Sequence, residues 1–322
     1  MRREGERGVA LLTVLLLVAV MAVVAIAVLD DLRFAVRRTA NARTMAQAQW
    51  YALGAEELAR VQIVRRARLD ADRTTLEGGW SGRTFTFPIE AGAIEARVSG
   101  ASGCFNLNSV VEGGGDRYVR HELGARQFMV LLSAIGFNDA AAAGLQGALV
   151  DWIDSDDVAL AAEDRAYASA ATPYRTAGAP LAEVSELRAI RGFTDEVYGR
   201  IRPFVCALPV GLSQINVNTL PADRAVLLTM LTEGRVSPAA ARRILMERPA
   251  SGWPNVDAFW NEPGLVNHAP GGPAREQAVV RTGFYAMDAR VEFGGSHATL
   301  SSLFEAQGGG VRLIARRWTP EE

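Results

Sequence analysis

The most chemically suggestive stretch of the sequence is an acidic segment near the middle of the chain. Six carboxylates fall within fourteen residues: Asp151, Asp154, Asp156, Asp157, Glu163 and Asp164. Such a concentration of like charge is either solvated or shares a cation, and calcium prefers six to eight oxygen ligands, largely carboxylate and carbonyl. The segment is not an EF-hand, because Ala159 replaces the turn glycine and Arg165 the closing glutamate. We predict a calcium site here, with a solvated acidic loop as the alternative.

The two cysteines, Cys104 and Cys206, are the next distinctive residues. In an oxidising compartment they can form one disulfide, and otherwise they are two buried thiols. A bridge would close a loop of about 100 residues and add about 4 kcal/mol of stability in the loop-entropy treatment.

Two segments resemble helix-hairpin-helix units, which bind DNA phosphates through glycine-rich hairpins. They are residues 184–201, with a hairpin at 190–193, and residues 216–244. In the first, Thr194 stands where a second hairpin glycine is expected, and in the second, residues 233–236 do not match. Because backbone amides need an open turn to cradle phosphate, we favour a structural use, with DNA binding as the alternative. A net charge of −2 adds no general attraction to nucleic acid.

Catalytic motifs are missing from the sequence. It has three histidines, no Gly-x-Ser-x-Gly and no metalloprotease motif, and it offers no pocket for a pair of hydrolytic carboxylates. We therefore predict no catalytic residues and do not expect an enzyme.

The element that must carry these features begins at the N-terminus. Val9 to Leu29 is an uninterrupted apolar run, long enough to cross a bilayer as a helix, and Thr13 is its one hydroxyl-bearing residue. Three arginines outnumber two glutamates before it, which favours a cytoplasmic N-terminus. A secretory signal peptide cut near Ala25-Ile26-Ala27 and a plain signal anchor are alternatives. A third interpretation depends on Arg7-Gly8, because a basic leader that ends in glycine directly before a long apolar helix resembles a type IV prepilin signal.

The helical pattern continues well beyond the apolar run. Residues 30–69 contain no proline and one glycine, Gly54, and their apolar residues recur at helical spacing: Leu32, Val36, Ala40, Met45, Trp50, Leu53, Leu58, Val61 and Val64. One helix from Val9 to about Leu69 would be roughly 90 Å long. A helix of that length is typical of a pilin spine, whose upper half packs on a sheet.

Alternating residues on both sides of the middle region predict that sheet. Phe85, Phe87 and Ile89, then Ile94, Ala96 and Val98, indicate a half-buried hairpin around residues 90–92. Residues 285–293, 297–305 and 311–318 read as three further strands. Between them, residues 106–281 read as almost entirely helical, with helices expected at 120–135, 138–153, 181–190, 194–201, 221–232, 238–247 and 256–260. The prediction is an α+β, type IV pilin-like fold with a large all-α domain inserted in its sheet.

The domain organisation follows from these elements. Residues 1–8 form a leader, 9–29 a transmembrane helix and 30–105 the first part of the pilin-like frame. Residues 106–281 form the inserted helical domain, and 282–322 the C-terminal strands of the frame.

Several motifs, in order along nearly the whole chain, resemble the K-type minor pseudopilin of type II secretion systems. They are the Gly8/Val9 junction and the segments 103–108, 151–157 with 163–164, 183–188, 203–209 and 215–219. The resemblance implies cleavage by a prepilin peptidase between Gly8 and Val9, methylation, two calcium ions near the acidic loop, and a disulfide. It also implies a tip complex with the I- and J-type minor pseudopilins, contacts with other pseudopilus and inner-membrane secretion components, and no nucleic-acid partner. The body would be periplasmic, held in the inner membrane by residues 9–29.

Thr13 departs from the wider pilin pattern. Most pilins carry glutamate at this fifth position after the cut, where it meets the N-terminal amine of the subunit above. An unpaired carboxylate in apolar surroundings is costly. A subunit with nothing above it has no such amine to meet, so Thr13 suits a tip position, with neutral drift as the alternative. A DNA-binding minor pilin of an uptake pilus is the alternative function.

Overall fold

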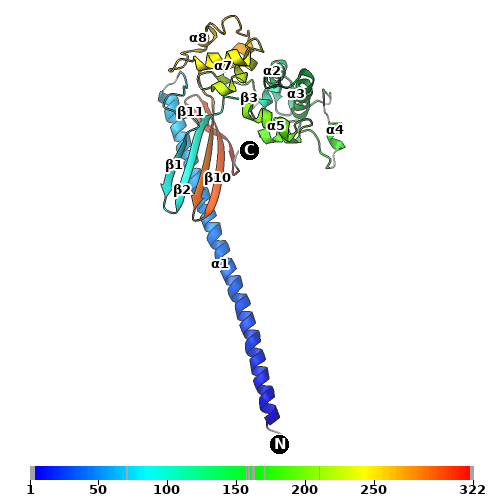
Figure 1. The fold of residues 1–322 in the computed structure, drawn as a ribbon, viewed down its shortest axis with the longest axis vertical. Coiled ribbons are helices and arrows are strands. Elements are labelled where there is room, and N and C mark those ends of the chain that lie inside the picture. The colour runs from blue at the N-terminus through cyan, green and yellow to red at the C-terminus, as the bar shows by residue number, and fades with distance from the viewer. Residues whose placement is uncertain are drawn as a thin grey trace.

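The computed structural model describes the backbone of residues 4–69, 72–156, 158, 160–161, 164–169, 172–209 and 211–319, and side chains within those ranges from Val9 onward. Figure 1 shows a long helix that carries a sheet along its upper half, with a helical region at the end remote from the N-terminus. This is the predicted α+β arrangement.

The long helix α1 runs without a break from Glu4 to Leu69, which is 66 residues. At 1.5 Å per residue it is about 100 Å long. The large apolar side chains between Val9 and Leu29 are more than half exposed, from 52% for Val18 to 70% for Leu12. Among the described residues, α1 is the one helix long and apolar enough to cross a membrane. The predicted continuous spine is confirmed.

The sheet has five antiparallel strands in the order β1-β2-β9-β10-β11. Their bounds are β1 Thr84–Ile89, β2 Gly92–Gly100, β9 Phe284–Phe293, β10 Ser296–Gln307 and β11 Gly310–Arg317. Strands β2 and β9 are neighbours although the whole insertion separates them in sequence. Gly92 permits this pairing at its lower end, because a Cβ there would lie 1.9 Å from the Glu292 carbonyl oxygen. The predicted hairpin and C-terminal strands are therefore present.

Small side chains form the side of α1 that packs on β9 and β10. This buried set consists of Ala48, Ala52, Ala55, Ala59 and Ile63. The alanines let the helix lie close to the inward side chains of β9, such as Tyr285 and Met287, which are 1% and 0% exposed. One charged residue, Glu56, interrupts this otherwise apolar contact.

Glu56 is bound from the sheet by two side chains. The Arg316 Nε donates to its Oε2 at 2.9 Å and the Ser302 hydroxyl donates to the same oxygen at 2.6 Å. Burial raises the pKa of Glu56, but the hydrogen bonds from Arg316 and Ser302 outweigh it, so the pKa lies below its ordinary value. The ion pair fixes the position of α1 on β10 and β11.

Most of the large apolar residues that mark the helical spacing in residues 30–69 lie outside this contact. Leu32, Val36, Trp50, Leu58 and Val61 are 57%, 67%, 68%, 58% and 49% exposed, whereas Leu53 packs partly buried against the core beneath α1. Large side chains dominate a hydrophobicity pattern, whereas the sheet contact requires small ones. The prediction of a half-buried first hairpin is also wrong for β1, because α1 covers β9 and β10 and leaves Phe85 and Phe87 at the sheet edge 40% and 45% exposed.

The described part of the insertion contains helices that largely follow the predicted ones. They are α2 Glu122–Ala134, α3 Asp139–Ile153, α4 Asp164–Ala168, α5 Asp195–Ile201, α6 Val226–Leu231, α7 Pro238–Met246, α8 Val256–Trp260 and α9 Pro273–Glu276. Four 3-10 turns cover Leu107–Val110, Val184–Ala189, Arg202–Phe204 and Ala222–Arg224. Asn138 caps α3 as expected, since its side chain accepts from the Ala141 N–H at 2.9 Å.

Short strands in this region were not predicted. They are β3 Phe105–Asn106, β4 Val111–Gly114, β5 Arg117–Arg120, β6 Val205–Cys206, β7 Ile215–Asn216 and β8 Ala278–Val279. The pairs β3–β6 and β7–β8 are parallel and join segments that lie far apart in sequence. Two-residue strands carry no readable alternation, so a pattern of apolar residues does not reveal them.

The insertion has its own apolar core, separate from the one beneath α1. Its buried side chains come from every part of the region, including Phe105, Phe128, Trp253 and Phe259. Contacts at its root tie it to the frame. The Thr74 N–H donates to the Val280 carbonyl at 2.8 Å, and Arg317 of β11 pairs with Glu183 at 2.7 Å.

Candidate functional site

The acidic segment begins at the C-terminal end of α3. Asp151 lies in the last turn of α3, Asp154 caps it, and Asp164 begins α4. Asp151 and Asp154 are buried, at 1% and 5% exposure. Asp157 and Glu163, the other predicted ligands in this loop besides Asp156, lie outside the described residues.

Asp151 holds the loop against the helix that precedes it. Its carboxylate accepts the Leu160 N–H at 3.0 Å and the Ala161 N–H at 2.6 Å. Gly147 one turn earlier makes room, since a Cβ there would lie 3.0 Å from the Ala161 Cβ. Asp151 therefore closes the loop through its own hydrogen bonds.

Asp164 is fixed at the opposite end of the loop. Its Oδ1 accepts the Thr176 N–H and the Thr176 hydroxyl, both at 2.9 Å. These hydrogen bonds lower the pKa of Asp164, first the backbone bond and then the hydroxyl, and Arg175 adds a smaller effect. Asp156 accepts the Val158 N–H at 2.8 Å. Asp151, Asp156 and Asp164 thus all accept hydrogen bonds from backbone N–H groups of this segment.

The donor chemistry of this loop matches calcium, which prefers carboxylate and carbonyl oxygens. Two of its carboxylates are nearly inaccessible, and buried charge is normally compensated by a partner or a cation. Within the described ranges, no three His, Cys, Asp or Glu side chains lie close enough together to hold a metal by themselves. A complete shell would therefore draw on further ligands, such as backbone carbonyls and the two acids outside those ranges.

An aromatic cluster connects the acidic loop to the helix-hairpin-helix-like turn at residues 190–193. The ring centroids of Trp152 and Tyr167 lie 5.4 Å apart, and those of Tyr167 and Tyr174 5.1 Å apart. The Tyr174 hydroxyl donates to the Ala189 carbonyl at 2.8 Å, and the Tyr167 hydroxyl accepts the Arg191 N–H at 3.2 Å. The order of the acidic loop is therefore coupled to the segment that resembles helix-hairpin-helix.

Three backbone N–H groups of the hairpin at residues 190–193 and its following residue are already occupied. Besides the Arg191 N–H, the Phe193 and Thr194 N–H groups donate to the Ile190 and Gly192 carbonyls at 3.1 and 3.0 Å. Ile190 and Phe193 are buried. A phosphate cradle needs free N–H groups, so this geometry favours a structural role.

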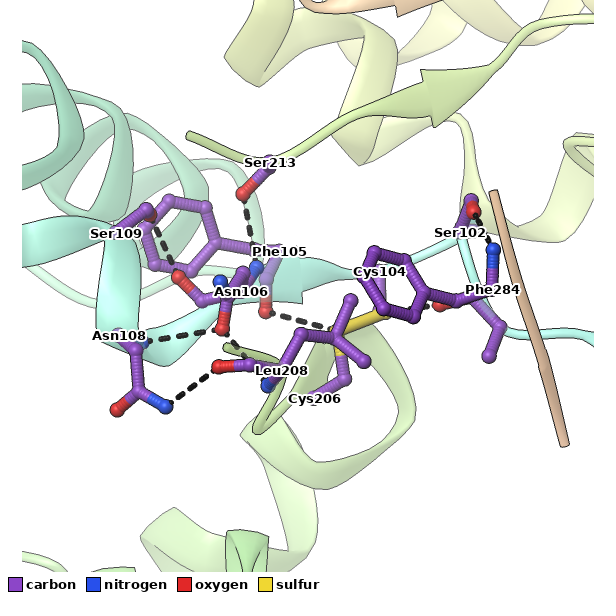
Figure 2. Close-up of a disulfide and its surroundings, with 12 residues drawn as sticks. Ser102, Cys104, Phe105, Asn106, Asn108, Ser109, Cys206, Leu208, Ser213 and Phe284 are labelled. Carbon is purple, nitrogen blue, oxygen red and sulfur yellow. Dashed lines mark hydrogen bonds between the residues drawn. A yellow bond between two sulfur atoms is a disulfide. The ribbon is translucent and has the colours of Figure 1, made fainter. Parts of the chain in front are cut away.

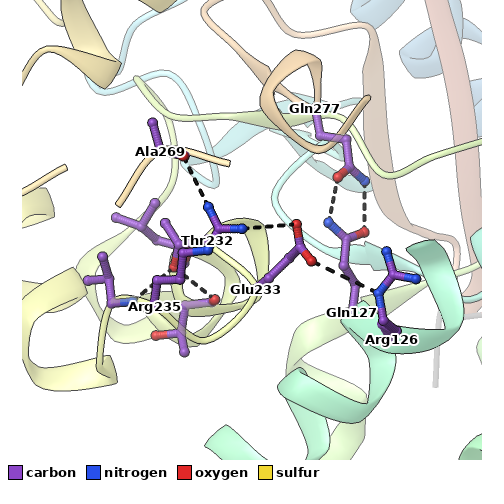
Figure 3. Close-up of polar contacts among 10 residues, drawn as sticks. Arg126, Gln127, Thr232, Glu233, Arg235, Ala269 and Gln277 are labelled. Atoms are coloured by element: carbon purple, nitrogen blue, oxygen red, sulfur yellow. Dashed lines mark hydrogen bonds and ion pairs between the residues drawn. The ribbon is translucent and has the colours of Figure 1, made fainter. Parts of the chain in front are cut away.

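The second hairpin, between α6 and α7, is occupied in the same way. The N–H groups of residues 233–236 all donate within the turn, to Met230, Thr229 and Thr232. The backbone of Glu233 has a positive φ of 51°. Its carboxylate forms ion pairs at 4.0 Å with Arg126 of α2 and with Arg235 (Figure 3). A carboxylate at the tip of this hairpin would repel phosphate.

A buried pair of glutamines lies beside the hairpin. Gln127 and Gln277 exchange amide hydrogen bonds at 2.5 and 3.0 Å.

The disulfide lies at the root of the insertion. Cys104 and Cys206 are bonded, with their Cα atoms 5.7 Å apart and a sequence separation of 102. It is directly next to the parallel pair β3–β6 (Figure 2). The bridge therefore pins residues 104–206 into one closed unit.

Two buried asparagines complete this root. The Asn106 Oδ1 accepts the N–H groups of Asn108 and Leu208 at 3.2 and 3.0 Å, as Figure 2 shows. The Asn108 amide donates to the carbonyls of Leu181 and Leu208 at 2.9 and 2.7 Å. They replace the backbone pairing that a longer strand would supply.

The same arrangement recurs at the root of the second half. Asn216 accepts the Asn218 N–H at 2.9 Å, and the Asn218 side chain bonds both the N–H and the carbonyl of Trp253, at 2.7 and 2.9 Å. Both segments are distinctive in the sequence, but their repetition went unpredicted. The shared pattern, apolar-Asn-apolar-Asn-Ser/Thr at 105–109 and 215–219, is the signal that reveals it. A pair of buried asparagines therefore joins distant segments at the root of each half of the insertion.

The processing residues lie at the opposite end of the molecule. Gly8 and Val9 are helical, within the first turns of α1. Thr13 is exposed and its hydroxyl donates to the Ala10 carbonyl at 2.9 Å, so its polar atom is satisfied within the helix.

Known proteins share both the sequence and the fold. The family description "Type II secretion system (T2SS), protein K" matches residues 103–210 and 215–281. Type II secretion system protein K of Klebsiella pneumoniae is 36% identical over 97% of this chain and 96% of its own. That of Pectobacterium carotovorum subsp. carotovorum is 33% identical over 98% and 97%.

A solved structure extends the similarity to three dimensions. In the crystal structure of the GspK-GspI-GspJ complex from the type 2 secretion system of enterotoxigenic Escherichia coli, one chain is 28% identical. It covers 88% of this chain and 99% of its own, with a TM-score of 0.76. The chain therefore belongs to the type II secretion system protein K family of minor pseudopilins, which are structural components of secretion and not enzymes.

Proposed function

We propose that this chain forms the tip of a secretion pseudopilus together with the I- and J-type minor pseudopilins. In that role it initiates the pseudopilus and limits its length during protein export across the outer membrane. The proposal rests on one geometric observation: the inserted domain lies at the end of the body remote from the apolar span (Figure 1). A subunit added above would have to occupy the space that the insertion fills.

Thr13 supports the tip position. Because residue 13 is threonine, the helix presents no carboxylate to a neighbouring amine at this level, and the hydroxyl is satisfied by the Ala10 carbonyl. The exposed span from Val9 to Leu29 suits an inner-membrane anchor before assembly, with a cytoplasmic N-terminus and a periplasmic body.

Maturation provides the experiment. A prepilin peptidase would cut between Gly8 and Val9, and the new N-terminus would be methylated. Gly8→Ala should leave the leader uncut and abolish secretion, whereas Arg7→Lys, which keeps the basic leader, should mature normally. A Gly8→Ala protein that matures and supports secretion would contradict the proposal.

Calcium is part of the same proposal. Asp151, Asp154, Asp156 and Asp164, with Asp157 and Glu163, would hold it together with backbone carbonyls, and the cation would neutralise their mutual repulsion. Thermal melting of the full chain in calcium and in chelator tests this, because a ligand that binds the folded state raises the melting temperature. An unchanged melting temperature would contradict calcium binding by this loop.

A further inference from the structure

A cleft of about 600 Å³ lies between the sheet and the root of the insertion. Strands β2, β9, β10 and β11 line it on one side, and the insertion contributes residues from 180–183 and 202–209 on the other. The disulfide between Cys104 and Cys206 forms part of its wall. Ligand sites commonly lie between two domains and have volumes of this size.

The sheet supplies a floor of mostly small side chains. In β10, Ser302 bonds to Glu56 of α1, so its neighbour Leu303 faces away from that helix. Ala286 of β9 and Ala315 of β11 are the cross-strand partners of Leu303, and all three line the cleft. The two alanines leave room above the sheet that larger side chains would fill.

Arginines dominate the charged side chains of the lining. The ionisable residues there are Arg202, Arg224, Arg316, Arg317, Glu183 and Asp288. Arg317 pairs with Glu183 at 2.7 Å. Arg224 instead donates to the Gly103 carbonyl at 3.0 Å, a bond that holds the guanidinium in place without neutralising its charge. The lining therefore has an excess of positive charge, which attracts carboxylates.

The cleft also reaches an edge of the sheet. β11 is the last strand in the order β1-β2-β9-β10-β11, so one side of its backbone has no strand partner in the described sheet. Its last four residues, 314–317, line the cleft. The insertion wall includes Pro180, Pro203 and Pro209, which have no N–H group to donate. An extended ligand would therefore find its main-chain hydrogen bonds on β11.

The charges along β11 select the kind of strand that can pair with this edge. Arg312, Arg316 and Arg317 all belong to β11. Like charges on an edge strand oppose pairing with a second copy of the same edge. The same arginines favour an extended segment that carries carboxylates, because cross-strand pairs of opposite charge are stabilising.

We propose that this cleft binds an extended acidic peptide segment of a partner protein. The segment adds to β11 as a further strand, and its carboxylates bind the arginines of the cleft, with Arg224 as the principal contact. This site is separate from the tip contact and does not depend on it.

The test measures the fluorescence anisotropy of labelled peptides mixed with the full chain in detergent. The probe is a hexapeptide of alternating glutamate and valine. One control peptide replaces glutamate by lysine, and a second carries methyl groups on its backbone nitrogens and so cannot add as a strand. We expect the probe to bind at least about tenfold more tightly than either control, with an affinity that falls as salt is raised.

Two substitutions test the cleft itself. Arg224→Gln should weaken binding of the probe about tenfold, because a charge-assisted hydrogen bond is lost. Ala315→Phe should weaken it as well by filling the floor, and it leaves the bond between Arg224 and Gly103 intact. The matched control is Arg312→Gln, on the same strand but outside the lining, with a side chain that is 75% exposed. It should change the affinity by less than about twofold.

Urea unfolding of each variant shows that its fold is retained. Equal binding of the probe and the lysine peptide, or of the probe and the methylated peptide, would overturn the proposal. Equal affinities of Arg224→Gln and Arg312→Gln for the probe, together with unchanged affinity of Ala315→Phe, would also overturn it. Displacement of the probe by glutarate as effectively as by unlabelled peptide would make the cleft a site for small anions and overturn it too.

Discussion

Substituting Asn218 by alanine should selectively destabilise the second half of the insertion. Asn218 is 1% exposed, and its side chain bonds both the N–H and the carbonyl of Trp253, which is 2% exposed. The substitution leaves two buried backbone groups without partners, at about 1–3 kcal/mol each. Gly252, at φ +71°, makes this pairing possible, because a Cβ there would lie 2.7 Å from the Asn218 side chain.

We therefore expect a loss of about 2–6 kcal/mol in the free energy of unfolding, measured by urea titration of the full chain followed by tryptophan fluorescence. The control is Asn255→Ala, which removes an exposed side chain that caps α8 through the Ala258 N–H at 2.8 Å, and should cost about 1 kcal/mol. Equal losses of stability in the two variants would refute the reasoning, because the buried hydrogen bonds of Asn218 would then stabilise the fold no more than an exposed helix cap does.

Three other substitutions test the ion pair of the frame, the disulfide and the apolar span. Glu56→Gln should lower the stability of the frame by about 2 kcal/mol at pH 7, a value reduced because Arg316 stays partly solvated. Since the pKa of Glu56 is depressed, its contribution is present above its unfolded-state pKa and is lost as pH falls through the folded pKa, so acid titration of unfolding should show a smaller pH dependence in Glu56→Gln. Replacing Cys104 and Cys206 by serine should cost about 4 kcal/mol in urea unfolding, and a reductant should have no effect on that variant. If no subunit lies above this chain, Thr13→Glu should reduce secretion, because its carboxylate would meet no amine and would cost up to about 3 kcal/mol in apolar surroundings, whereas Thr13→Val should not.

Long, strongly periodic elements were predictable from sequence. The spine helix follows from sixty residues without proline, and the strands of residues 285–318 follow from regular alternation between glycine pairs. Two cysteines have one possible pairing, so Cys104 and Cys206 suggest a bridge, but the sequence alone leaves open whether it forms. The helix and the strands are thus predictable because residue composition and local hydrophobic periodicity determine them.

The root of the insertion could not be predicted in that way. The pairs β3–β6 and β7–β8 are two residues long, and they depend on side-chain amides rather than on strand pattern. An asparagine that completes a sheet edge has the same local sequence as one that caps a helix, so the 215–219 segment is compatible with either use. Only the position of the distant acceptor or donor, such as Leu208 or Trp253, distinguishes the two.

The side chains of α1 that contact the sheet are inconspicuous in the sequence for a physical reason. A helix that must lie close to a sheet selects alanine, as at Ala48, Ala52 and Ala55, and alanine contributes little to a hydrophobicity pattern. The strong apolar signal comes from Trp50, Leu58 and Val61, which the isolated chain leaves exposed. The sequence pattern of α1 therefore carries a weak signal from the alanines that contact the sheet and a stronger one from large side chains that lie outside that contact, and a search for a single hydrophobic period follows the stronger signal.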